Sequence, residues 1–138
     1  MKISNESIGH ALLRVGLGLD FLAHGLSRIG QLPGFAETMK GMFAKSFLPE
    51  PLVVVTAYAI PPVELVVGLG IVLGLLLRPA LIAGGIEMWI LLFGSCLIQQ
   101  WDMAAFQLIY LLLLSLLLAT LQHDRLSIGA IRTRAGEH

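Results

Sequence analysis

Four hydrophobic stretches constrain this chain more than any other feature of its sequence. They cover roughly residues 7–29, 52–77, 80–100 and 103–121. A helix of about 20 apolar residues is long enough to cross the hydrocarbon core of a bilayer. The sequence therefore predicts an all-α fold, an integral membrane four-helix bundle, in a single transmembrane domain over residues 1–138.

The composition agrees with a membrane location and excludes several functions. Hydrophobic residues make up 57% of the chain and charged residues 13%, with a mean hydropathy of +0.85. The formal net charge is zero, so we expect membrane lipid around the protein and no nucleic acid as a partner. Cys96 is the only cysteine, which excludes an intrachain disulfide, a CxxC redox pair and a cysteine-ligated iron–sulfur cluster.

The connections between the hydrophobic stretches differ sharply in length. Arg78-Pro79 and Gln100–Asp102 are almost the whole of two links, which predicts tight antiparallel hairpins. The first link, residues 30–51, is long and carries apolar side chains at helical spacing. These are Phe35, Met39, Met42, Phe43 and Phe47. The pattern predicts a short amphipathic interfacial helix, with a loop packed over the mouth of the bundle as an equal alternative.

The basic residues outside the hydrophobic stretches indicate the orientation, because cytoplasmic segments carry an excess of Lys and Arg. One side of the membrane receives Lys2, Arg78, Arg125, Arg132 and Arg134, and the other receives Arg28, Lys40 and Lys45. We therefore expect the N- and C-termini to be cytoplasmic in a multi-pass protein of a bacterial-type inner membrane.

The first hydrophobic stretch contains a stripe of ionisable residues. On a helical wheel they fall within about 120° of one another. The members are His10, Arg14, Asp20, His24 and Arg28. Charged groups inside a membrane usually face the bundle interior or water, so the stripe predicts a polar cavity.

The later stretches add Glu64, Glu87 and the amide of Gln107. A rise of about 1.5 Å per residue places Glu87 at the depth of Arg14, which predicts an ion pair between them, with a pair of Arg14 and Asp20 as the alternative. The same estimate predicts a pair of acids near the midplane, Asp20 and Glu64, of which one holds a proton. Such a pair suits proton exchange with a quinone or a transported substrate. The alternative is an ion-pair network that only fixes the helix register.

Familiar catalytic motifs are missing from the sequence. It has no Walker loop, HExxH motif or dinucleotide-binding turn. His10 and His24 have the spacing of transmembrane di-haem sites, but the other histidines, His123 and His138, lie in the tail. This excludes a haem pair within one chain, and we expect no metal site and no covalent cofactor.

The chain resembles the DoxX family of small four-helix membrane proteins. The resemblance rests on LLRVGLGLDFLAHGLSRI in the first stretch, PPVELVVGLGIVLGLLLRPA across the second and third, and HDRLSIGA in the tail. It marks Arg14, Glu64 and His24 as recurrent polar positions. The chain departs from relatives that have Lys at Arg28 and Asn at Gln107. A relative in this family is the membrane subunit of a thiosulfate:quinone oxidoreductase.

These features together lead to one functional hypothesis and one alternative. The hypothesis is a DoxX-like membrane component of a redox system, a subunit of a quinone-linked oxidoreductase, that binds a quinone or similar small molecule between the first three stretches. A soluble redox partner is then required, and a homodimer is compatible with the many small residues. The ligand-binding candidates are Arg14, Asp20, His24, Arg28, Glu64, Glu87 and Gln107. The alternative is a non-enzymatic assembly or transport protein whose buried charges are structural.

Overall fold

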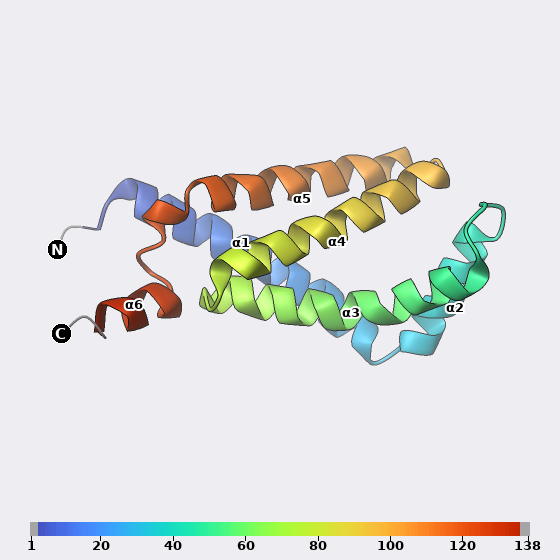
Figure 1. The fold of residues 1–138 in the computed structure, drawn as a ribbon, viewed down its shortest axis with the longest axis horizontal. Helices are drawn as coiled ribbons and strands as arrows, with labels where there is room; N and C mark the ends of the chain where they lie inside the picture. Colours follow the sequence, from blue (N-terminus) through green and yellow to red (C-terminus); the bar gives the residue numbers. More distant parts are fainter. Residues whose placement is uncertain (1–2, 136–138) are drawn as a thin grey trace.

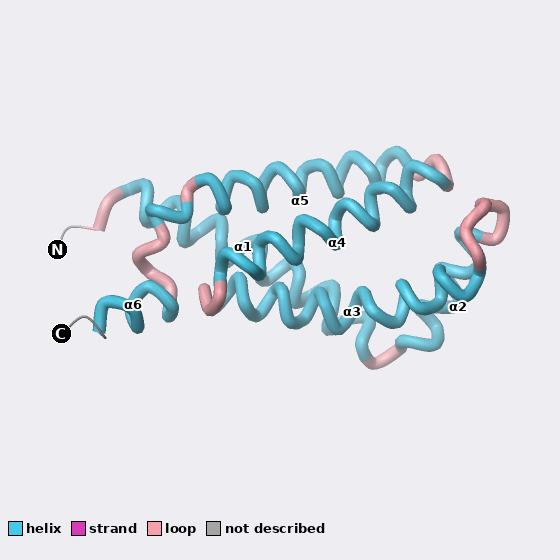
Figure 2. Tube along the Cα trace, viewed as in Figure 1, coloured by secondary structure: helices cyan, strands magenta, loops and turns pink. Residues whose placement is uncertain are grey.

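A computed structural model describes residues 3–135, and all of the regular elements in this range are helices (Figures 1 and 2). The helices are α1 (Asn5–Ile29), α2 (Leu32–Phe43), α3 (Glu50–Leu73), α4 (Leu77–Leu97), α5 (Trp101–Ala119), the 3-10 turn η1 (Leu121–His123) and α6 (Ile128–Ala135). The all-α prediction is confirmed for this part of the chain.

Three of the described helices, α3, α4 and α5, are long and apolar enough to cross a membrane. Their outer faces carry large exposed apolar side chains, for example Val66, Trp89 and Leu112. Such surfaces suit lipid contact, because lipid tails are as apolar as these side chains. α1 is equally long at 25 residues, but it carries the polar stripe. A fourth crossing helix therefore stays a prediction.

α1 runs beside only half of α3. The two backbones touch at small residues: a Cβ atom on Gly68 would lie 2.7 Å from the backbone nitrogen of Leu22. Further along, Gly25 packs directly against Leu65. Since α1 ends four residues later at Ile29, its end lies beside the middle of α3 (Figure 1).

α2 takes over where α1 stops and packs along the N-terminal half of α3 (Figure 1). Gly30 ends α1, and Pro33 lies in the first turn of α2, where its missing N–H is not needed. Ala36 and Phe43 bury their side chains against the bundle. The short helix predicted in the first link is therefore present, while its place at a membrane interface stays a prediction.

The two predicted hairpins are both present. Gly74 ends α3 with a φ of +65°, a conformation that glycine adopts without strain. α4 begins at Leu77, three residues earlier than predicted, because Pro79 is tolerated in the first turn of a helix. Pro61 and Pro62 both lie inside α3, which continues through them.

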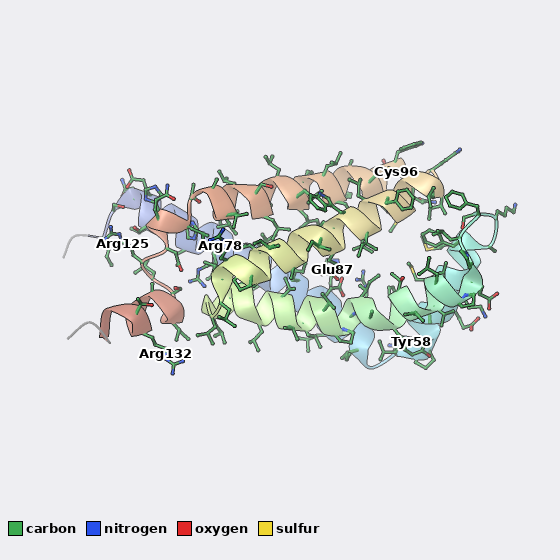
Figure 3. All side chains as sticks on the ribbon, viewed as in Figure 1. Tyr58, Arg78, Glu87, Cys96, Arg125 and Arg132 are labelled. Carbon is green, nitrogen blue, oxygen red and sulfur yellow. The ribbon has the colours of Figure 1, made fainter. Side chains whose placement is uncertain are left out.

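One end of the molecule gathers the α3–α4 turn, η1 and α6, and α2 lies at the opposite end (Figure 1). Arg78, Arg125 and Arg132 lie at the tail end (Figure 3). Lys2 and the side chain of Arg134 lie outside the described part. The predicted cytoplasmic cations that can be placed therefore share one end, while the side of the membrane stays a prediction.

Candidate functional site

The stripe on α1 divides into two sites, and Arg14 belongs to the one at the tail end. Its guanidinium is 3% exposed and donates from Nη1 to the carbonyl of Ile71 at 2.8 Å and to that of Val72. Its Nε lies 3.7 Å from Oδ1 of Asp124. The last carbonyls of a helix have no partner within the helix and carry partial negative charge. Arg14 therefore caps the C-terminus of α3.

The tail closes over this cap. Ser127 is 1% exposed, and its hydroxyl donates to Oδ2 of Asp124 at 2.6 Å. The same hydroxyl accepts from the backbone N–H of Ala130 at 3.0 Å, which starts α6. Nearby, Nδ1 of His10 lies 3.0 Å from Oγ1 of Thr120 at the end of α5. Two members of the predicted stripe thus hold the tail to the helices.

The predicted ion pair between Arg14 and Glu87 is wrong. Because α4 starts at Leu77, Glu87 lies ten residues, or about 15 Å, along the helix and deeper than predicted. Arg14 lies level with the end of α3 and finds its partners there, including the tail carboxylate of Asp124.

Arg28 forms the second site, at the other end of the stripe. Its Nη1 donates to Oε1 of Glu64, whose side chain is only 5% exposed. Its guanidinium carbon lies 5.0 Å from the centre of the Phe35 ring, which is a cation–π distance. Arg28 therefore links α1, α3 and α2 through one side chain.

Asp20 has its own partners beside this pair. The hydroxyl of Tyr110 on α5 donates to Oδ2 of Asp20 at 2.5 Å, and Nδ1 of His24 lies 3.1 Å from the same oxygen. The predicted direct pair of acids is wrong, because Asp20 and Glu64 each bind a different donor. Both acids nevertheless line one cavity.

This inner cavity has a volume of about 250 Å³. Five of the predicted residues line it: Asp20, His24, Arg28, Glu64 and Gln107. α5 forms a wall with residues at helical spacing, namely Met103, Phe106, Gln107 and Tyr110. The cavity therefore lies between four helices, α1, α3, α4 and α5, instead of the predicted three.

A second cavity of about 390 Å³ lies beside the first, toward α2. The two share Arg28, Leu91, Met103 and Gln107 as lining residues. The walls of the second cavity are mainly apolar, and α2 provides Phe35, Met39, Met42 and Phe43. The predicted cover over the polar site is therefore present in α2, although Phe47 is 76% exposed and does not take part.

The remaining candidate, Glu87, lies apart from the lining of both cavities. It points from α4 toward α3 and is 5% exposed (Figure 3). Neither of its carboxyl oxygens has a hydrogen-bond partner among the described residues. Oε1 of Gln107 is likewise unpartnered within residues 3–135. Three or more potential metal ligands come together nowhere in this part of the chain.

The sequence reasoning missed Tyr110, Phe35 and Asp124 as members of these sites. Tyr110 lies three residues after Gln107, so their shared helix face was a usable signal. Phe35 was recognised only as apolar. Asp124 had no signal, because its contact with Arg14 depends on how the tail folds back.

Comparison with known proteins gives one family match. The family model for DoxX matches residues 9–96, from α1 through nearly all of α4. Neither the curated proteins nor the solved structures include a significant match. The matched region contains the Arg28–Glu64 pair, Asp20, His24 and Arg14, whereas the α5 wall and the tail residues Asp124 and Ser127 lie beyond it. Together with the three long apolar helices, the match shows that this multi-pass membrane protein belongs to the DoxX family.

Proposed function

We propose that the protein is the membrane component of a redox system and binds a quinone, or a similar amphiphile, in the two neighbouring cavities. The observation that carries this proposal is that Arg28 and Gln107 line both cavities. The inner cavity is lined by several ionisable side chains and the outer one mainly by apolar side chains, which matches a molecule with a polar head and an apolar chain. Ligand sites usually have volumes of about 300–1,000 Å³, a range that the outer cavity reaches by itself.

The inner cavity offers the donors that such a head requires. Quinone carbonyl oxygens accept hydrogen bonds, and Arg28, Tyr110 and His24 all carry N–H or O–H groups at the cavity wall. Reduction of a bound quinone takes up protons as well as electrons. Asp20 and Glu64 are the carboxyl groups at the wall that exchange protons in this proposal. A soluble redox partner supplies the electrons.

The two arginines have different roles in this proposal. Arg28, not Arg14, is the cation that meets the head, because Arg14 is bound to the carbonyls of α3 and to Asp124. Glu64 holds Arg28 in place until the ligand arrives. Arg14 keeps the tail end of the bundle closed.

The proposed topology has four crossing segments, α1, α3, α4 and α5, with α2 at the outer membrane interface. The tail and the α3–α4 turn then face the cytoplasm of a bacterial-type cell. Labelling of single cysteines at Lys40 and Arg132 with a membrane-impermeant reagent tests this orientation. We expect labelling from outside at Lys40 alone, and labelling at Arg132 alone would reverse the orientation.

Quinone binding is tested with purified protein in lipid nanodiscs. A short-chain ubiquinone analogue should raise the melting temperature, because a ligand that binds only the folded state stabilises it. We expect Arg28→Gln to abolish this rise and Arg125→Gln, an exposed arginine at the tail end, to retain it. An equal rise in both variants would place the quinone elsewhere.

The second candidate is a non-enzymatic assembly or transport protein. It is favoured by one observation: both arginine pairs join separate elements, α1 to the tail and α1 to α3. Under this function no quinone analogue changes the melting temperature, and Arg28→Gln lowers stability without any other effect.

A further inference from the structure

Glu87 is a buried acid that the cavity does not use. Its side chain points from α4 toward α3 (Figure 3), and both carboxyl oxygens are shielded from solvent. Gly84 lies one turn earlier on the same face and packs against Val67 of α3. Glu87 is therefore held in the contact between two apolar helices.

The charged groups around Glu87 come from two helices. In the antiparallel hairpin of α3 and α4, the contact of Gly84 with Val67 sets Glu87 level with Glu64. Glu64 in turn binds Arg28 of α1. Oε1 of Glu64 accepts from Arg28, but its Oε2 is buried and has no partner among the described residues. On the far side of Glu64, Asp20 is bound by His24 of the same helix and by Tyr110 of α5. The free acceptors at this place are thus Oε2 of Glu64 and both oxygens of Glu87.

An ionised carboxylate in this setting would have neither water nor a donor to stabilise it. A second negative charge beside Glu64 would raise the cost further, since like charges at short range disfavour double ionisation. Arg28 already binds Glu64 and compensates only one of the two charges. A proton on one carboxyl group removes this conflict and supplies the missing donor.

We propose that Glu87 and Glu64 form a proton-binding site between α3 and α4 that holds one exchangeable proton. Glu87 carries the proton while Arg28 binds Glu64. The pair holds one proton and one negative charge, and no electron moves.

Infrared spectroscopy of the protein in nanodiscs tests the site without any ligand. A protonated carboxyl group has a carbonyl stretching band that separates it from carboxylates. At neutral pH we expect this band in the wild type, its shift in D2O, and its loss in Glu87→Gln. Glu37→Gln, which removes an exposed acid paired with Lys40, should retain the band. Glu64→Gln should also retain it, because Glu87 then keeps its proton.

Two results would overturn the proposal. One is a wild-type protein without the band, and the other is a Glu87→Gln variant that still shows it. If Glu87→Gln does not fold, Glu87→Asp is measured in its place. This variant should shift the frequency of the band without removing it. A band at an unchanged frequency would overturn the proposal. If the wild-type protein lacks the protonated-carboxyl band and is more stable in a sodium salt than in a choline salt, the two carboxylates bind a cation in place of the proton. No quinone takes part, so failure here leaves the proposed cavity function standing.

Discussion

Arg14 and Arg28 lie on the same face of α1, fourteen residues apart, yet the structure uses them differently. Arg14 lies level with the end of α3, where free backbone carbonyls bind it. Arg28 lies level with the middle of α3, where its partner is the side-chain carboxylate of Glu64.

The same difference sets how much freedom each arginine has. The side chain of Arg14 is 4% exposed and that of Arg28 is 29% exposed, because Arg28 lines both cavities. A buried cation that binds backbone carbonyls and lies beside a carboxylate serves the fold. A cation that binds one carboxylate and also faces a cavity, as Arg28 does, can exchange that carboxylate for a ligand.

The largest effect is expected from Arg14→Leu. This change leaves Asp124 charged and largely buried and frees the last carbonyls of α3. Removing one partner of a buried ion pair costs about 3–5 kcal/mol of unfolding free energy. Denaturant unfolding in detergent measures the loss, with Arg78→Leu, an exposed arginine, as the control.

Arg14→Leu combined with Asp124→Leu should lose less than the sum of the two single changes, since neither charge is then left alone. Additive losses would show that the 3.7 Å contact between Nε and the carboxylate contributes nothing.

Arg28→Leu is expected to cost less, about 3 kcal/mol, at the lower end of the range for a broken buried pair. The open cavity beside Glu64 lets water or a proton reach the carboxyl group and soften the loss. Unfolding curves of Arg28→Leu and of Arg28→Leu with Glu64→Leu measure the effect. A loss as large as that of Arg14→Leu would remove the distinction between the two arginines.

Gly68→Ala tests the contact that places both arginines against α3. The new methyl group would approach the backbone of Leu22, which cannot move aside as a flexible side chain can. Overpacking of this kind costs about 1–3 kcal/mol and should shift α1 relative to both sites. Gly16→Ala is the matched control on the same helix pair, because among the described residues no atom lies within 4 Å of the new methyl group. Thermal unfolding of both variants decides whether the contact matters.

The features that could be predicted from the sequence depend on local pattern. The two hairpins, the short helix after Gly30, and the shared face of Asp20, His24 and Arg28 all follow from periodicity and turn residues, although the turns lie at residues 74–76 and 98–100 and not at the predicted Arg78-Pro79 and Gln100–Asp102. These four features needed no knowledge of which helix packs against which.

The partners of the charged residues could not be predicted in this way. They depend on the register between helices, and α1 ends only halfway along α3. Two residues at the same number of positions from the ends of their helices therefore do not lie level with each other in the bundle. Arg14 then met the tail instead of Glu87, and Glu64 met Arg28 instead of Asp20. Gln107 was the only predicted contribution of α5, and the contact of Tyr110 with Asp20 depends on the same register.

The smallest expected effect concerns Lys40, which repeats the α2–α3 link of Arg28 in an exposed setting. Its Nζ lies 3.2 Å from Oε1 of Glu37 on α2 and 3.1 Å from Oε1 of Glu50 at the start of α3. Hydrogen bonds to Glu50 and Glu37 raise the pKa of Lys40 above its usual value, so the charged form is favoured in the folded state. The stabilisation is therefore present at neutral pH and is lost as the pH rises through the pKa of Lys40.

Exposed ion pairs are screened by water and salt, so Lys40→Met should lower the melting temperature only slightly at low salt and not measurably at high salt. Melting curves of both proteins at two salt concentrations measure this, with Lys45→Met as the control. A large, salt-independent loss would mean that the link between α2 and α3 depends on this surface pair, and the contrast with the buried Arg28–Glu64 pair would no longer hold.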